Sequence, residues 1–200
     1  MLTATLADSA AVTASLVGKV NLTLTDTVVG TVSVLGATDN SNVTVSLNHN
    51  ALLGNSIITL GNGNDTITLV DSATSTATIT VGSGTDGITL SATHGVENII
   101  FSAANGASQT VPTTVTNDLA GGTFTWATNA INNAITHEGA VLTIAAGVSG
   151  AVSTNGYSDF TTGGNTYIYE NTGTLATSEL VAIVGAHTLA SATIAVGTIA

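Results

Sequence analysis

The chain has 200 residues, of which 12 are Asp or Glu and one is Lys or Arg, so its formal net charge is −11. A single basic residue, Lys19, cannot neutralise a phosphate backbone, which excludes a nucleic-acid-binding protein. The absence of cysteine excludes a fold held by disulfides. Hydrophobic residues make up 44% of the chain, so it is expected to fold rather than remain disordered.

Neither an N-terminal signal peptide nor a transmembrane helix is predicted from the sequence. No basic residue precedes Asp8, so no cleavable signal peptide is predicted. The most apolar stretch, residues 182–200, is too rich in glycine, threonine and serine for a transmembrane helix. We therefore expect no membrane insertion.

Short strands are predicted along most of the chain, because hydrophobic residues alternate with Thr, Ser or Asn. In chain order the clearest runs are residues 20–25, 31–35, 43–47, 66–69 and 76–81. Thr and Val branch at Cβ and favour pleated structure. Clusters of Gly, Asn, Asp and Ser between the runs predict tight turns. The only helix expected is short, at about residues 127–137.

The turns recur at intervals of about twenty residues. The turn at residues 61–65 is followed 21 residues later by the turn at 82–86, and related turns lie near Asp39 and Gly106. A second set of turns, near 48–54, 71–75 and 93–95, lies midway between them. Two turn sets offset by half a period predict an all-β fold, a parallel β-solenoid with two strands and two turns per coil. A β-sandwich with irregular hairpins is the alternative.

The excess of acidic residues predicts bound cations. Eleven carboxylates lack a basic residue to balance them, and an oxygen-rich chain without cysteine favours a hard cation, calcium first. The four histidines, His49, His94, His137 and His187, are too scattered to predict a zinc site.

The turn sequences resemble the calcium-binding nonapeptide of RTX (hemolysin-type) proteins, G-G-x-G-x-D-x-U-x. Residues 61–68 read GNGNDTIT and residues 82–89 read GSGTDGIT, with Asn62 and Ser83 in place of the second glycine. The resemblance implies a β-roll-like solenoid in which calcium lies between stacked turns. The implied ligands are the backbones of Gly61, Gly63, Gly82 and Gly84 and the carboxylates of Asp65 and Asp86.

The later part of the chain is similar to the C-terminal regions of bacterial surface-layer-like proteins that are exported by type I secretion. The similar stretches are residues 95–100, 163–169 and 179–185. This resemblance implies an uncleaved C-terminal secretion signal and an extracellular location at the bacterial cell surface. We expect residues 1–108 to form the solenoid and residues 109–200, starting near Pro112, to form a β-rich cap with the short helix.

Other groups of residues in the sequence give only weak indications of a catalytic or metal site. His94 with Glu97, and His137 with Glu138, could belong to a metal or acid–base site, but neither lies in a zinc-binding helix motif, so solvated loop residues are the favoured interpretation. Asp65 could pair with Asp71 or Glu97 in a glycosidase, yet the single tryptophan, Trp126, lies far from them in sequence. Trp126 is instead expected in a core of the C-terminal part, with Phe124, Tyr157, Phe160, Tyr167 and Tyr169.

Together these features predict a non-enzymatic, secreted structural protein that binds calcium and assembles with copies of itself into a surface layer or matrix fibre. Polymer formation is expected to depend on calcium. The alternative is an adhesin or an ice- or polysaccharide-binding module, because Thr66 with Thr68, and Thr76 with Thr78 and Thr80, form Thr-x-Thr patterns on a solenoid face. Cell-surface polysaccharide is therefore a second candidate partner besides the protein itself.

Overall fold

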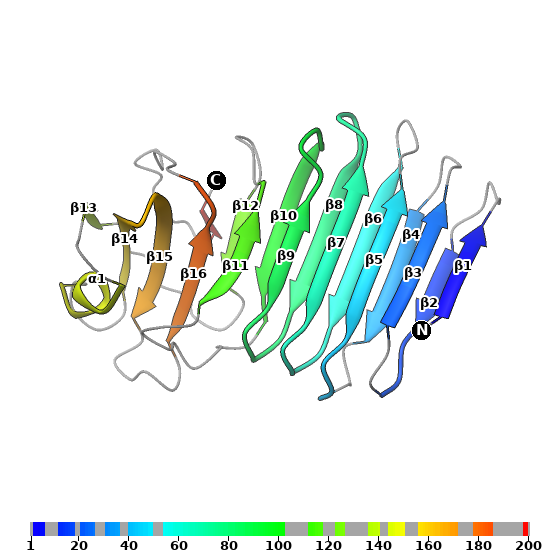
Figure 1. Cartoon of the computed structure of the whole chain (residues 1–200), viewed down its shortest axis with the longest axis horizontal. Coiled ribbons are helices and arrows are strands. Elements are labelled where there is room, and N and C mark those ends of the chain that lie inside the picture. The colour runs from blue at the N-terminus through cyan, green and yellow to red at the C-terminus, as the bar shows by residue number, and fades with distance from the viewer. Residues whose placement is uncertain are drawn as a thin grey trace.

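The structure is a computed structural model, and it describes thirteen segments of the chain. These are residues 2–6, 12–18, 21–26, 31–36, 40–49, 54–102, 112–117, 123–126, 136–140, 144–150, 156–171, 178–185 and 198–199. Nearly all of these residues lie in strands or in the turns between them (Figure 1). No helix in the described segments is long and apolar enough to cross a bilayer.

Two sheets form the molecule. The first sheet has ten strands, in the order β1 (Leu2–Leu6), β3 (Asn21–Asp26), β5 (Thr44–His49), β7 (Thr66–Asp71), β9 (Gly87–Leu90), β11 (Thr113–Thr116), β16 (Glu179–Ile183), β15 (Asn165–Asn171), β14 (Gly156–Thr162) and β13 (Thr136–Ala140). The second sheet has seven, in the order β17 (Thr198–Ile199), β12 (Thr123–Trp126), β10 (Val96–Phe101), β8 (Thr76–Val81), β6 (Asn55–Leu60), β4 (Thr31–Gly36) and β2 (Val12–Ser15).

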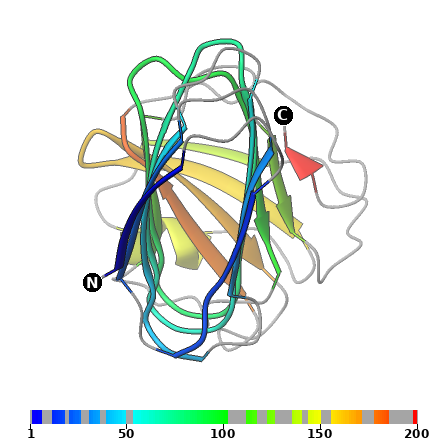
Figure 2. The ribbon, with the colours of Figure 1, turned by 90° about the vertical axis from the view of Figure 1, so that its right-hand side faces the viewer.

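The chain passes from one sheet to the other with every strand from β1 to β12, so consecutive coils stack on one another. Each strand pairs in parallel with the strand two places later; for example, Thr44 of β5 pairs with Thr66 of β7, which pairs with Gly87 of β9. Viewed along the stack, the coils superimpose as a flattened tube with one sheet on each side (Figure 2). The predicted parallel β-solenoid is confirmed.

The core lies between the two sheets, and the alternation in the sequence builds it. In β7, for example, Ile67 and Leu69 are buried while Thr66 and Val70 on the other face are exposed. Ile58 and Ile79 from the second sheet belong to the same core. Because coils repeat this pattern in register, each apolar side chain packs on those of the next coil, which a single coil could not achieve alone.

The C-terminal part continues the first sheet. Strands β14, β15 and β16 pair in antiparallel fashion, and β16 joins the solenoid by pairing in parallel with β11. Strands β11 and β12 still stack on β9 and β10, so the coils extend past residue 108, where the boundary was predicted. Gly163 and Gly164 have positive φ at the turn between β14 and β15.

The aromatic residues that were expected in a C-terminal core are all buried, but in two clusters. Phe124, Trp126 and Tyr157 join the solenoid core, and Trp126 lies 5.1 Å from Tyr157 between ring centroids. Phe160, Tyr167 and Tyr169 form a separate cluster with Val148 of the helix α1 (Ile144–Gly150). The helix predicted at residues 127–137 is wrong at its end, because Thr136 and His137 lie in β13; its other residues lie outside the described segments.

Candidate functional site

The residues of the two RTX-like turns meet at one corner of the solenoid. This Asp corner consists of the stacked turns at residues 40–43, 61–65 and 82–86 together with Thr113, each immediately before or at the start of a strand of the first sheet. The backbone N–H of Gly63 donates to the carbonyl of Ser83 at 2.8 Å, so the two turns touch directly. The predicted alignment of the turns is therefore confirmed. Asp39 and Gly106 lie outside the described residues.

The two carboxylates at this corner are buried and accept hydrogen bonds from the backbone. Asp65 and Asp86 are each 2% exposed. Oδ1 of Asp86 accepts the N–H of Asp65 at 2.9 Å, and Oδ1 of Asp65 accepts the N–H of Val43 at 2.8 Å. Each carboxylate thus reaches back to the preceding coil and holds its backbone.

The rest of the Asp corner is also joined by direct hydrogen bonds. Asn64 donates its N–H to Oδ1 of Asn42 at 2.9 Å, and Thr85 donates its N–H to Oδ1 of Asn64 at 2.9 Å. Gly82 lies so close to the preceding turn that a Cβ atom there would be 2.3 Å from the carbonyl oxygen of Gly61. The asparagine side chains and the glycines therefore allow the turns to stack in contact.

This arrangement does not fit a calcium ion held between the turns. Calcium takes six to eight oxygen ligands at about 2.3–2.6 Å. Here the carbonyl of Gly61 accepts the N–H of Gly82 at 3.1 Å, and each aspartate uses one oxygen for an amide. Among the described residues, no group of three acidic, histidine or cysteine side chains could hold a metal. Calcium binding stays a prediction.

Burial has a large effect on the acidity of Asp86. Loss of hydration raises the pKa of this carboxyl from its ordinary value of 3.8 to about 7; the hydrogen bond from the Asp65 backbone lowers the pKa, and the Asp65 charge raises it. Oδ2 of Asp86 is buried and has no hydrogen-bond partner among the described residues. At neutral pH a substantial fraction of Asp86 is therefore protonated.

We expect the protein to lose stability as the pH rises from about 4 to about 7. The folded state holds the proton of Asp86 over this range while the unfolded state releases it, so the contribution is fully present below pH 4 and lost near pH 7. Its size is roughly 3–4 kcal/mol. The free energy of unfolding should be measured at several pH values for the wild type and Asp86→Asn. A difference between them that does not change with pH would contradict this assignment.

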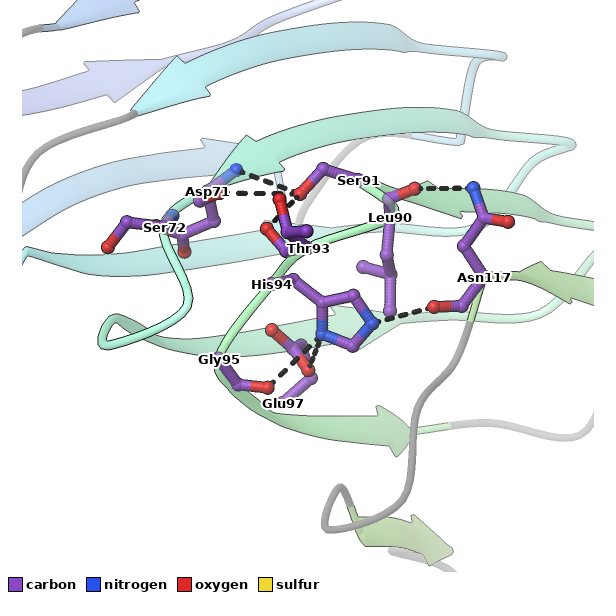
Figure 3. Close-up of polar contacts among 9 residues, drawn as sticks. All are labelled: Asp71, Ser72, Leu90, Ser91, Thr93, His94, Gly95, Glu97 and Asn117. Atoms are coloured by element: carbon purple, nitrogen blue, oxygen red, sulfur yellow. Dashed lines mark hydrogen bonds and ion pairs between the residues drawn. The ribbon is translucent and has the colours of Figure 1, made fainter.

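The opposite corner of the solenoid contains a second group of polar residues, most of them buried. This His corner consists of the buried residues His49, Asp71, His94 and Glu97, with partly buried Ser91 and exposed Asn117 from the next coil. Figure 3 shows these residues except His49. Nδ1 of His49 lies 3.0 Å from the hydroxyl of Ser56, and the hydroxyl of Ser91 donates to the carbonyl of Asp71 at 3.3 Å. The two histidines and the two acidic residues of this group lie inside the corner rather than in solvent.

His94 and Glu97 form a buried ion pair. Nδ1 of His94 lies 2.5 Å from Oε2 of Glu97, and Nε2 lies 2.6 Å from the carbonyl oxygen of Asn117. A carbonyl oxygen only accepts, so we assign a proton to Nε2 and a second proton between Nδ1 and Glu97. In Figure 3 the imidazole ring bridges Glu97 and Asn117 and thereby joins two coils.

The interpretation of His94 and Glu97 as solvated loop residues is wrong, since their side chains are 0% and 1% exposed. Glu97 faces inward because it shares the buried face of β10 with Ile99 and Phe101. Both side chains are buried, and the pair links two coils through the contact of His94 with Asn117. Asp65 and Asp71 stand at opposite ends of β7 and do not form a carboxylate pair. The side chains of His137 and Glu138 lie outside the described part of the chain.

Every acidic side chain that the structure describes is buried. These are Asp65, Asp71, Asp86, Glu97, Asp159, Glu170 and Glu179, none more than 9% exposed. In the C-terminal part, the Tyr157 hydroxyl donates to Oε1 of Glu170 at 3.2 Å, and burial with the nearby Glu170 charge raises the pKa of Tyr157 far above its usual range. Acidic residues are usually exposed in globular proteins, so this distribution is unusual.

Many of the outward-facing side chains of the solenoid are small and carry hydroxyl or amide groups. On the first sheet, one row of partly exposed or exposed side chains runs across five strands in register: Thr23, Ser46, Thr68, Thr89 and Thr116. On the second sheet, outward-facing Thr78 lies between Ile57 and Asn98. Among the described side chains, no charged residue faces outward from either sheet of the solenoid.

The fold places this chain among β-solenoid proteins. Comparison with models of protein families, with curated proteins and with solved structures finds no match. The similarity to RTX repeats therefore depends on the two turn motifs alone, and the function must be argued from the residues of this chain.

Proposed function

We propose that this protein is a non-enzymatic structural protein that assembles with copies of itself into an extracellular layer or fibre at the bacterial cell surface. The observation that carries the proposal is the distribution of charge. A chain with a net charge of −11 would repel its own copies if the carboxylates stood on its faces. The seven described carboxylates are inside, so the described side chains on the two sheet faces are neutral and can approach another copy closely.

The face of the second sheet is the better candidate for the contact between copies. Three of its outward-facing residues are apolar and exposed, namely Leu35 (40%), Ile57 (37%) and Val96 (53%). Among the described side chains on the solenoid strands of the first sheet, only Val70 is both apolar and exposed to this extent. Burial of apolar surface is the main favourable contribution to association. Calcium is not part of this proposal, because one oxygen of each aspartate and the carbonyl of Gly61 already accept backbone amides at the Asp corner.

Negative-stain electron microscopy of the purified protein tests the proposal, with and without a chelator. We expect ordered polymers from the wild type, and dispersed particles from Thr78→Glu, which introduces a charge at the centre of the second sheet's face. Thr68→Glu is the matched control, because it introduces the same charge at the centre of the first sheet's face. Dispersed wild-type particles at high protein concentration would rule out self-assembly.

A second candidate function is binding of ice or polysaccharide by the first sheet's face. The registered row from Thr23 to Thr116 favours it, since strands about 4.8 Å apart present hydroxyl groups at a regular spacing. This candidate predicts dispersed wild-type particles that bind the ligand, and loss of binding in Thr68→Glu but not in Thr78→Glu.

A further inference from the structure

One residue in each of four consecutive coils occupies the same position at the Asp corner. These residues are Val43, Asp65, Asp86 and Thr113, and each lies one residue before a mutually paired set, Thr44, Thr66, Gly87 and Thr114. All four are buried, with exposures between 0% and 2%. We call this set the corner column.

Within the corner column, each side-chain oxygen accepts the backbone N–H of the preceding member. Val43 donates to Asp65 at 2.8 Å, Asp65 donates to Asp86 at 2.9 Å, and Asp86 donates to the hydroxyl of Thr113 at 3.3 Å. The carbonyls of the same residues accept from the following coil, for example Asp65 from Gly87 at 2.9 Å and Asp86 from Thr114 at 2.8 Å. The backbone of each of these three donors is therefore fully satisfied by the next coil, as a buried backbone requires.

The residue types in the corner column show what the position needs. Asp65 and Asp86 carry ionisable carboxyl groups, but Thr113 carries a hydroxyl group and accepts the same hydrogen bond. The hydroxyl group of Thr113 has no negative charge that could attract a cation. The property that Asp65, Asp86 and Thr113 share is therefore a side-chain oxygen that accepts a hydrogen bond. The hydrogens of the donated amides also carry partial positive charge and point at one oxygen of each aspartate, which places positive charge next to an oxygen that a calcium ion would use.

We propose that Asp65 and Asp86 join consecutive coils as hydrogen-bond acceptors for backbone amides, and that the Asp corner closes without bound calcium. Their task is then the one that Thr113 performs in the next coil. The RTX-like turn sequences serve in this chain to stack turns in direct contact. This inference concerns folding of the solenoid and does not depend on the proposed function.

Two substitutions at one position separate the acceptor from the charge. Asp86→Asn and Asp86→Val both remove the ionisable carboxyl group, but only asparagine keeps the oxygen that accepts the Asp65 amide. In buffer with a chelator, we expect the midpoint of thermal unfolding of Asp86→Val to lie roughly 5 °C below that of Asp86→Asn. Thr113→Val, which leaves the Asp86 amide without its acceptor, is expected to show a similar loss relative to the control Thr116→Val on the outer face.

Calcium titration of the wild type tests the second half of the proposal without any substitution. We expect cooperative unfolding in chelator, a midpoint that shifts by less than about 2 °C in millimolar calcium, and no heat of binding by calorimetry. The proposal is overturned if the wild type is unfolded in chelator and folds when calcium is added. Equal midpoints for Asp86→Asn and Asp86→Val would also overturn it.

Discussion

Replacement of Gly84 with alanine is expected to prevent the solenoid from folding. Gly84 has φ of +133°, and a Cβ atom there would lie 2.0 Å from the carbonyl oxygen of Gly63 in the preceding turn. The positive φ and the close carbonyl oxygen are both features of the backbone, and the backbone cannot move here without breaking the contact between the stacked turns. We expect a loss of more than about 4 kcal/mol in the free energy of unfolding, large enough to unfold a marginally stable protein.

Gly87→Ala is the matched control for this prediction. Gly87 lies three residues later, and a Cβ atom built there meets nothing within 4 Å. Circular dichroism should show native β structure and a nearly unchanged unfolding midpoint for Gly87→Ala, and little or no cooperative unfolding for Gly84→Ala. A midpoint for Gly84→Ala within about 2 °C of the wild type would show that the turns do not stack as described.

The second large effect is expected at the His corner. Glu97→Leu removes one partner of the buried ion pair and leaves the His94 imidazole in the core without its carboxylate. Loss of one partner from a buried pair costs about 3–5 kcal/mol, which in a protein of this size lowers the unfolding midpoint by roughly 10 °C.

The double variant with His94→Leu and Glu97→Leu separates electrostatics from packing. Because hydrophobic replacement of both partners is often neutral, we expect the double variant to recover most of the stability that Glu97→Leu loses. Thermal unfolding of the wild type, the single variant and the double variant measures this. If the double variant is no more stable than Glu97→Leu, the pair stabilises the fold through the packing of its side chains and not through its charges.

The fold could be predicted because its signals are local and repeated. Alternation of Thr with Val, Ile or Leu predicts a strand with one buried face, and the 21-residue step from Asp65 to Asp86 is the length of one coil in the structure. The step to Thr113 is 27 residues, so its equivalence to Asp86 was hidden by a longer connection. Sequence spacing detects coils of equal length and misses those with insertions.

The role of the aspartates could not be read from their spacing. A calcium ligand and an acceptor for a backbone amide both require an oxygen at the same place in the turn, so both roles are compatible with the same turn sequence. What distinguishes them is the direction of the neighbouring N–H groups, here those of Val43 and Asp65. That direction depends on how the coils stack and is not encoded in a single turn.

The His94–Glu97 pair was missed for a different reason. Polar residues in a turn are usually solvated, and His94 lies in one. The strand pattern did contain a signal, because Glu97 is two residues before Ile99 and four before Phe101 and so must share their inward face. For Glu97, the alternation of side chains along the strand thus predicts burial more accurately than the polarity of the residue does.

The coils also differ in length while keeping the same cross-section. Registered partners in neighbouring coils are separated by 20 residues between β8 and β10 and by 27 between β9 and β11, yet the strands remain aligned. The register of the paired strands does not depend on the length of the coil, so the cross-section does not limit how many coils the molecule contains. Duplication or deletion of one whole coil, such as residues 66–86, would change its length by about 4.8 Å and leave its width untouched. The length of such a molecule can therefore change in steps of one coil, by gain or loss of single repeats.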